Sequence, residues 1–200
     1  MFGSYQPELF DANAAPAMLA MLVEAQAPYV DLWVGETLSL IGEALAVTNA
    51  VASGPGPNEL WLSFTVPDSV ITETITLRSG ESIADMVSAV AGRCDAILFN
   101  CSPPEMITLA LEELSSVLMR YDPNVRSSLR VGAYANGFEP KPPGHAANET
   151  LLGRRDDLTP ESYLATAQRW VDGGASIIGG CCHMHVEHID ALHAGLRRTL

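Results

Sequence analysis

The sequence is poor in basic residues, and this excludes one large class of partners. Its 200 residues include 11 lysines and arginines against 24 aspartates and glutamates, which gives a formal net charge of −13. Such a chain repels a polyanion, and no basic stripe interrupts the acidic background. Nucleic-acid binding is therefore excluded, and the negative charge mainly favours solubility.

Long apolar runs and a secretion signal are also lacking. Every apolar stretch is interrupted by charge or proline well short of a membrane span, and the N-terminus does not pair a basic end with an apolar segment. Apolar residues nevertheless make up 48% of the chain and charged residues 18%, which indicates a folded globular domain. We expect no membrane association and a cytoplasmic location.

Cysteine is scarce as well, with four residues in the chain. So few cysteines in a chain of this length do not form a disulfide framework, and the Cys-x-x-Cys pattern of redox motifs is absent. Three of the four nevertheless occur in suggestive places, at Cys101 and at the adjacent pair Cys181 and Cys182. In a reducing compartment, clustered thiols more often bind metal or carry out chemistry.

Short β-rich runs alternate with longer helical ones along the chain. Five near-continuous apolar runs predict parallel strands buried on both faces, at 29–34, 60–66, 96–100, 129–134 and 176–180. Helical periodicity predicts helices at 81–92, 103–120, 160–172 and 187–198, and the segment 15–27 is also helix-like. Two start signals support the helices: a capping box from Ser102 to Glu105, and Thr159 as an N-cap before Pro160. The alternation predicts an α/β fold with a parallel sheet.

Two arrangements of such units are a doubly wound sheet and a (β/α)₈ barrel. No glycine-rich phosphate loop follows the first strand, which argues against a nucleotide-binding fold. The long polar stretch 136–158 follows the fourth strand, where barrel enzymes keep their sites. A barrel typically needs about 250 residues, and helix 15–27, apolar almost all round, needs to be covered. We therefore expect a chain that begins partway through a domain.

The three clustered cysteines lie at the carboxyl ends of two predicted strands. Ends two strands apart in a flat sheet are roughly 9.6 Å apart, whereas thiolates that share one zinc must lie within about 4 Å of each other. A curved, barrel-like sheet would bring Cys101 to Cys181 and Cys182, and this favours a metal site over ordinary packing. Cys94 precedes its strand and is interpreted as structural.

Several alternatives stay open at this end of the sheet. A vicinal disulfide between Cys181 and Cys182 requires strained geometry. His183 or His185 would add a fourth ligand and make a metal site structural, whereas three sulfurs alone leave a position for a substrate. His188 is expected to be a surface residue of the last helix.

Two polar residues share that end of the sheet with the cysteines. Glu36, just past the first strand, either starts a helix or receives a substrate ammonium. Asn136, after the fourth strand, either shapes a turn or contacts a ligand.

At these residues the sequence closely resembles the homocysteine S-methyltransferase family. "LFNCS" (98–102) and "GGCC" (179–182), with "EHI" (187–189) after it, resemble the cysteine motifs of its barrel strands six and eight. "VGETLSLIGEA" (34–44) resembles the strand-four segment with the substrate-binding glutamate, and "VGAYANGFEP" (131–140) resembles strand seven. The family commonly has glycine after the paired cysteines and proline before the glutamate–histidine pair, where this chain has His183 and Val186.

The resemblance implies a fold, a cofactor and a reaction. The fold is a (β/α)₈ TIM barrel, here incomplete, with five strands equivalent to strands four to eight in a single N-terminally truncated domain, 1–200. Cys101, Cys181 and Cys182 would bind Zn²⁺, and Glu36 and Asn136 would bind substrate. The reaction would move a methyl group from a sulfonium, betaine or folate donor to the homocysteine thiol, giving methionine.

The alternative function is a non-catalytic zinc-binding or oligomeric barrel fragment. Five strands leave two sheet edges unpaired, and such edges favour self-association.

Overall fold

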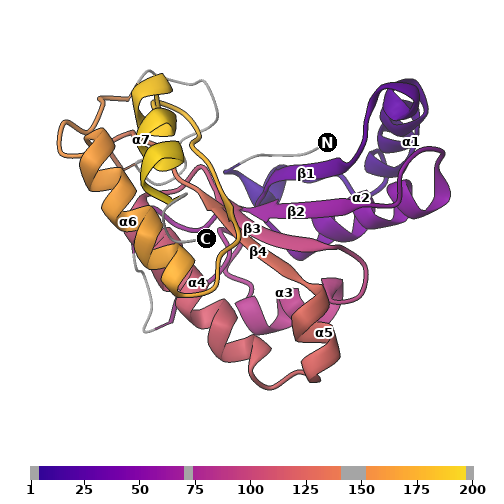
Figure 1. The fold of residues 1–200 in the computed structure, drawn as a ribbon. Helices are drawn as coiled ribbons and strands as arrows, with labels where there is room; N and C mark the ends of the chain where they lie inside the picture. The colour runs from indigo at the N-terminus through magenta and orange to yellow at the C-terminus, as the bar shows by residue number, and fades with distance from the viewer. Residues whose placement is uncertain (1–4, 70–73, 141–151, 197–200) are drawn as a thin grey trace.

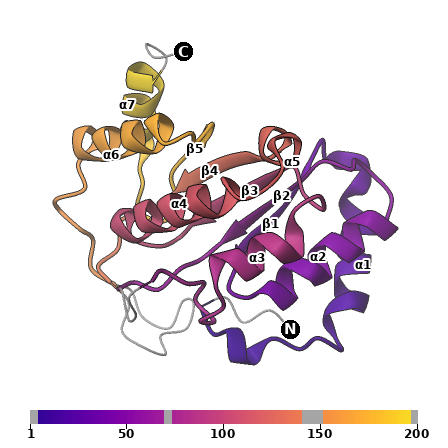
Figure 2. The ribbon, with the colours of Figure 1, turned by 90° about the horizontal axis from the view of Figure 1, so that it is seen from below.

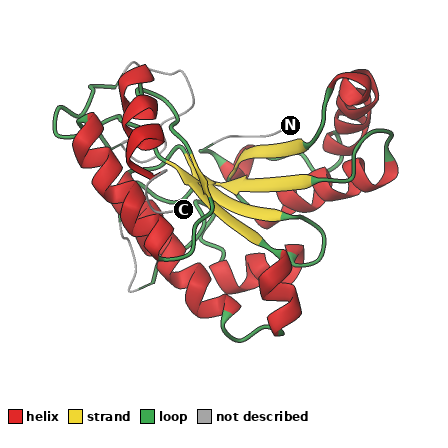
Figure 3. Ribbon diagram, viewed as in Figure 1, coloured by secondary structure: helices red, strands yellow, loops and turns green. Residues whose placement is uncertain are grey.

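A computed structural model describes residues 5–69, 74–140 and 152–196 of the chain. These residues form one parallel sheet of five strands in the order β1-β2-β3-β4-β5, so each strand pairs with its neighbour in sequence. The strands are β1 (Trp33–Leu38), β2 (Leu60–Phe64), β3 (Ala96–Asn100), β4 (Arg130–Tyr134) and β5 (Ile177–Ile178). They fan out across the middle of the molecule (Figure 3). The predicted α/β fold with a parallel sheet is confirmed, and sequential order is what a strand series of a barrel requires.

Helices follow every strand and lead back to the start of the next one (Figure 1). The α-helices are α1 (Ala15–Gln26), α2 (Ile41–Ser53), α3 (Ile83–Val90), α4 (Pro104–Leu118), α5 (Pro123–Ser128), α6 (Pro160–Asp172) and α7 (Val186–Leu196). Two short 3-10 helices, η1 (Pro7–Leu9) and η2 (Ala27–Tyr29), flank α1. Figure 2 shows α2, α3 and α4 side by side along one face of the sheet. Among the described residues, no such row of helices lies along the opposite face.

The hydrophobic core lies between the sheet and these helices. Alternate strand residues such as Leu62, Phe64, Ile97 and Phe99 are fully buried there, because successive side chains of a strand point to opposite faces. The apolar residues that recur with helical spacing on α3 also point into this layer. The residues that alternate with these therefore point to the other face of the sheet, which is concave.

The concave face is polar toward the carboxyl ends of the strands. Ser63 is aligned with Leu98, and Asn100 with Tyr134, which puts Ser63, Asn100 and Tyr134 on that face. The Ser63 hydroxyl donates to Asn100 Oδ1 over 2.9 Å. Polar side chains thus converge at the end of the sheet where the predicted site lies.

The boundaries of the first and last strands differ from the prediction. The segment predicted as strand 29–34 starts at Tyr29, which is the last residue of the 3-10 helix η2. Strand β1 starts at Trp33, so Glu36 lies inside the strand and not past its end. The last strand is limited to Ile177–Ile178, because Gly179 and Gly180 follow with no side chain to pack.

Both predicted helices start close to where they were expected, but one of the two predicted caps is wrong. Ser102 does not cap α4: its hydroxyl accepts from the Val66 amide over 3.0 Å and donates to the Val66 carbonyl over 3.1 Å. The N-cap of α4 is Pro103, which has no side-chain cap. Thr159 does cap α6, since its hydroxyl accepts from the Ser162 amide over 3.3 Å. Ser102 therefore ties the end of β3 to the end of β2 in place of starting a helix.

Within the described segments, none of the helices combines the length and the apolar character that crossing a bilayer demands. The predicted loop 136–158 is described at its two ends, and its central residues, 141–151, lie outside the described part.

Candidate metal centre at the carboxyl ends of the strands

Three cysteine sulfurs meet at the carboxyl end of the sheet. The Cys101 sulfur lies 2.7 Å from that of Cys181 and 3.7 Å from that of Cys182, and the sulfurs of the adjacent pair are 3.9 Å apart. The strands that lead to them, β3 and β5, are separated by β4, so curvature of the sheet closes a gap that would be roughly 9.6 Å in a flat one. The structure thus brings together all three predicted residues.

The sulfur geometry suits a single metal ion. Ligand atoms from Cys101, Cys181 and Cys182 all lie within 4.8 Å of one another, and three sulfurs around a tetrahedral zinc would be roughly 3.8 Å apart. No disulfide joins them, because all are free thiols. Exposure rises from buried Cys101 through Cys181 to exposed Cys182, so the cluster is open to an incoming ligand on the Cys182 side.

Without a cation these thiols hold their protons firmly. The hydrogen bond with Cys101, followed by burial, raises the pKa of the Cys181 thiol, and burial followed by the charge of Cys101 raises the pKa of the Cys182 thiol. Three thiolates so close together repel one another, whereas a divalent cation removes that repulsion and takes the place of the protons. The cluster is therefore chemically matched to a soft divalent metal.

Backbone strain is concentrated at this place. In the described part of the chain, the non-glycine residues with positive φ are Tyr5 (48°), Thr37 (60°), Cys101 (50°) and His183 (60°). Cys101 is one of the three clustered cysteines, His183 follows the adjacent pair, and Tyr5 and Thr37 contact the same end of the sheet. Left-handed backbone is costly for such residues and gathers at functional sites. The strain marks the cysteine end of the sheet as the site.

The adjacent cysteines are held by a short strand extension and a buried tyrosine. The Cys181 amide donates to the Ala135 carbonyl over 2.9 Å, which continues the pairing of β5 with β4. The hydroxyl of fully buried Tyr163 on α6 donates to the Gly179 carbonyl over 2.7 Å and accepts from the Ala135 amide over 3.1 Å. A side chain at Gly180 would lie 2.5 Å from Met184. Gly180 therefore serves the tight turn after the strand.

Tyr5 belongs to the site and escaped sequence reasoning. Its hydroxyl is hydrogen-bonded to Cys101, and burial together with the neighbouring thiols raises its pKa. The guanidinium of Arg78 lies 5.0 Å from the centre of its ring, a cation–π distance. The segment that precedes η1 therefore returns to the cysteines, and no local pattern around Tyr5 signals this.

Glu36 lies on β1 at the edge of the concave face. Its Oε1 accepts a hydrogen bond from the Tyr134 hydroxyl over 3.1 Å. Next to it, the Thr37 hydroxyl accepts from Asn100 Nδ2 over 2.9 Å, and Asn100 in turn accepts from Ser63. A polar network therefore crosses the sheet from β1 to β4 directly beside the cysteines.

Asn136 combines the two roles considered for it. Its Oδ1 accepts from the Phe138 amide over 3.2 Å, which is the behaviour of a turn residue. The side chain is 1% exposed, and no described group accepts from its Nδ2. A buried amide donor without an acceptor costs about 1–3 kcal/mol, so this nitrogen is suited to an acceptor supplied by a ligand.

The histidines lie beside the cluster and not in it. Among the described residues, the group of mutually close candidate metal ligands consists of the three cysteines. The ring of His183 packs edge-on against Phe138 with centres 4.4 Å apart, and the ring of His185 lies 6.0 Å from that of His183.

The prediction that His188 is a surface residue is wrong, because it is 3% exposed. Its Nδ1 accepts from the His185 amide and its Nε2 donates to the Leu158 carbonyl over 2.9 Å. His188 therefore joins the loop before α6 to the start of α7.

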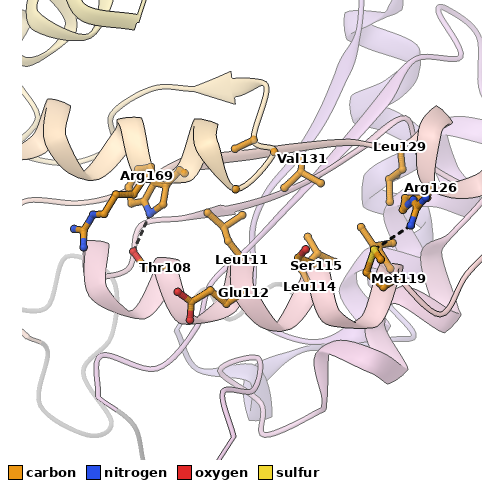
Figure 4. Close-up of a pocket in the computed structure, with 15 residues that line it drawn as sticks. Thr108, Leu111, Glu112, Leu114, Ser115, Met119, Arg126, Leu129, Val131 and Arg169 are labelled. Atoms are coloured by element: carbon orange, nitrogen blue, oxygen red, sulfur yellow. Dashed lines mark hydrogen bonds between the residues drawn. The ribbon is translucent and has the colours of Figure 1, made fainter. Parts of the chain in front are cut away.

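Two other features lie away from the centre. Cys94 lies just before β3 and packs against the core. Burial, aided by the charge of Asp95, raises the pKa of its thiol to about 12, which agrees with a structural role. A pocket of about 530 Å³ opens between α4 and α6 on the helical side of the sheet (Figure 4). Its lining contains none of the candidate site residues, so we do not assign it to the centre.

Comparisons with known proteins agree with this arrangement. The family model of homocysteine S-methyltransferases matches residues 4–196. Homocysteine S-methyltransferase 2 of Arabidopsis thaliana is 28% identical over 187 residues, 91% of this chain and 50% of the relative. Homocysteine S-methyltransferase YbgG of Bacillus subtilis is 29% identical over 184 residues, again 91% and 50%. The chain thus spans about half the length of these curated relatives.

A solved structure supports the fold. The oxidised form of the homocysteine methyltransferase MmuM from Escherichia coli superimposes with a TM-score of 0.64 and 24% identity, over 96% of this chain and 56% of that one. At this identity the likeness speaks for the architecture, a five-stranded part of a larger α/β arrangement. Because the family model extends over nearly the whole chain, the chain belongs to the homocysteine S-methyltransferase family.

Proposed function

We propose that this chain carries the metal centre of a zinc-dependent S-methyltransferase that methylates the thiol of homocysteine and yields methionine. The main support is the meeting of three sulfurs, from the ends of β3 and β5, within 3.9 Å of one another. The names of the relatives support homocysteine as the acceptor. Residues 1–200 would act as a single homocysteine-binding unit.

Cys101, Cys181 and Cys182 would hold the zinc. Three protein ligands are the pattern of catalytic zinc sites, which keep one position for water or substrate. When bound, zinc would supply a positive charge that turns an acceptor thiol, with an ordinary pKa of about 8.5, into a thiolate at neutral pH. The exposed side of the cluster, at Cys182, leaves room for that acceptor.

Glu36 and Asn136 would hold the amino-acid end of the acceptor. Glu36 offers a carboxylate to the ammonium group, and no described cationic side chain forms an ion pair with it. Asn136 offers its Nδ2 hydrogens to an oxygen of the acceptor's carboxylate. Both would orient the acceptor so that its sulfur points away from the sheet.

Methyl transfer itself needs little from the protein beyond this orientation. The acceptor thiolate attacks the methyl carbon, the bond from that carbon to the donor's sulfur or nitrogen breaks, and its electron pair stays on the donor. A sulfonium, betaine and a methylated folate are the candidate donors. Negative charge at Glu36 and the cysteines would favour a donor whose methyl is attached to a cationic atom.

The test combines metal content with turnover. Purified wild-type protein should hold one zinc per chain and convert homocysteine to methionine with one of the four donors S-methylmethionine, S-adenosylmethionine, betaine and methyltetrahydrofolate. Cys101→Ala should lose both properties, and the matched control Cys94→Ala should keep both. Zinc retained in full by Cys101→Ala would contradict the proposal.

The rival function is a structural or redox role without methyl transfer. A structural site would keep its zinc in Cys101→Ala and lose it in His183→Ala. A redox protein would form a Cys181–Cys182 disulfide under mild oxidant without zinc. The three unbridged thiols support a reducing compartment, and we place the protein in the cytoplasm on that basis.

Self-association is a further part of the proposal. Exposed apolar side chains flank both ends of the sheet: Met21 (68%), Leu22 (46%) and Val34 (45%) beside β1, and Val186 (68%) and Ile189 (42%) on α7 after β5. The outer edges of β1 and β5 have no partner strand among the described residues. Pairing of these edges between two copies would bury both patches, and a dimer mass in light scattering would support it.

A further inference from the structure

The contact between Tyr134 and Glu36 crosses most of the sheet. Tyr134 ends β4 and Glu36 lies on β1, and these strands are three positions apart, roughly 14 Å in a flat sheet. The phenol hydroxyl nevertheless donates to Glu36 Oε1 over 3.1 Å. Both side chains therefore lean toward each other across the concave face, and the hydrogen bond ties its two sides together at the mouth.

The carboxylate of Glu36 needs such a partner to keep its direction. The register of β1 with β2 shifts between Gly35 and Leu38, so Glu36 lies in an irregular part of an edge strand. The residue is exposed, and its second carboxylate oxygen has no hydrogen bond to the described residues. Tyr134 thus fixes one oxygen, and the other, on an exposed residue that forms no ion pair with a described cation, is left for a ligand.

Tyr134 also lies beside the metal centre. Its carbonyl accepts from the Cys101 amide over 3.2 Å. Burial raises the pKa of its phenol, and the Glu36 carboxylate and the Cys181 thiol add to the effect. Tyr134 therefore adjoins both places that would hold the two ends of an amino-acid thiol: its backbone carbonyl holds the Cys101 amide and its side chain holds the Glu36 carboxylate.

We propose that Tyr134 is a positioning residue that holds the Glu36 carboxylate for the ammonium group of the acceptor and so selects amino-acid thiols over thiols without an amino group. This rests on the proposed function. Tyr134 itself need not contact the acceptor. Its hydroxyl acts through Glu36, by holding the carboxylate in the one orientation from which it reaches the acceptor's nitrogen.

The test is calorimetric binding to zinc-loaded protein, with homocysteine and with 4-mercaptobutanoate, which has the same carbon chain and no amino group. Tyr134→Phe should weaken homocysteine binding about tenfold, the loss expected for one hydrogen bond to a charged group. The binding of 4-mercaptobutanoate should change less than about twofold. Tyr29→Phe is the matched control, because Tyr29 is 86% exposed, and it should change neither.

A double-mutant cycle separates positioning from packing. In the Glu36→Gln background, Tyr134→Phe should have no further effect on homocysteine, because the two residues act as one unit. Equal weakening of both thiols by Tyr134→Phe, or unchanged homocysteine binding, would overturn the inference and leave the proposed function standing. Zinc-loaded wild-type protein that binds neither thiol would overturn the proposed function and this inference with it.

Discussion

Removing one oxygen atom from Tyr163 should destabilise the protein more than any surface change. The side chain is fully buried, and its hydroxyl serves two backbone groups, the Gly179 carbonyl and the Ala135 amide. Phenylalanine keeps the ring and its packing against Trp170, which lies 5.8 Å away between ring centres. Tyr163→Phe therefore isolates the two hydrogen bonds.

The expected loss follows from the burial of the two groups. Ala135 is completely buried, so its amide would have no replacement partner and would cost about 1–3 kcal/mol. Gly179 is partly accessible, so water can serve its carbonyl and the loss there is nearer the net value of about 1 kcal/mol. We expect a decrease of about 3 kcal/mol in the free energy of unfolding. For a chain of this size that corresponds to about 6–12 °C in Tm.

Urea denaturation followed by tryptophan fluorescence measures this loss, with the m-value expected to stay constant. Tyr121→Phe is the control, since Tyr121 is partly buried against the same core and its hydroxyl bonds no described group; its effect should stay below about 0.5 kcal/mol. A Tyr163→Phe variant as stable as the control would refute the bridging role of the hydroxyl. It would also remove the explanation of how the Gly179–Cys182 segment is held beside β4.

Two further perturbations test the fold around the centre. A side chain at Gly132 on β4 would lie 2.8 Å from the Ile177 carbonyl oxygen and from Leu98. Gly132→Ala should therefore separate β4 from β5 and lower the free energy of unfolding by at least about 2 kcal/mol. An unchanged urea midpoint would mean that the strands do not approach so closely. Hydrogen bonds from Arg155 lower the pKa of the Glu105 carboxyl. Because the pKa is lower in the folded state, the ionised carboxyl stabilises the protein above the unfolded pKa of about 4.3. This stabilisation is lost as the pH falls through the folded pKa. Glu105→Gln should therefore flatten the loss of stability below about pH 5, by under 1 kcal/mol because the Glu105 side chain is 55% exposed. An acid limb identical to wild type would show that the ion pair contributes nothing.

The cysteine cluster could be predicted because the position of each cysteine relative to a strand is visible in the local sequence. Cys101 directly follows β3, Cys181 and Cys182 come shortly after β5, and the carboxyl ends of parallel strands share one edge. The sequence also indicated that only a curved sheet would bring them together. Glu36 was placed at the correct end, although the strand begins four residues later than predicted, because the predicted run starts within the 3-10 helix η2.

The residues that sequence reasoning missed contact partners that lie far away in the sequence. Nothing around Tyr5 indicates contact with Cys101, almost a hundred residues away. Ser102 has the pattern of a capping box, yet the nearby end of β2 offers its hydroxyl a backbone partner at Val66. His188 looks like a surface residue until the loop at Leu158 covers it. In each case a partner distant in sequence decides the outcome.

X-ray absorption at the zinc edge, on protein loaded with one zinc per chain, tests the three-sulfur centre most directly. We predict three sulfur neighbours at about 2.3 Å and one lighter ligand, with a fourth sulfur when homocysteine is added. A shell made mainly of nitrogen and oxygen, or a sulfur count that does not rise when homocysteine is added, would contradict the assignment of these cysteines to the metal.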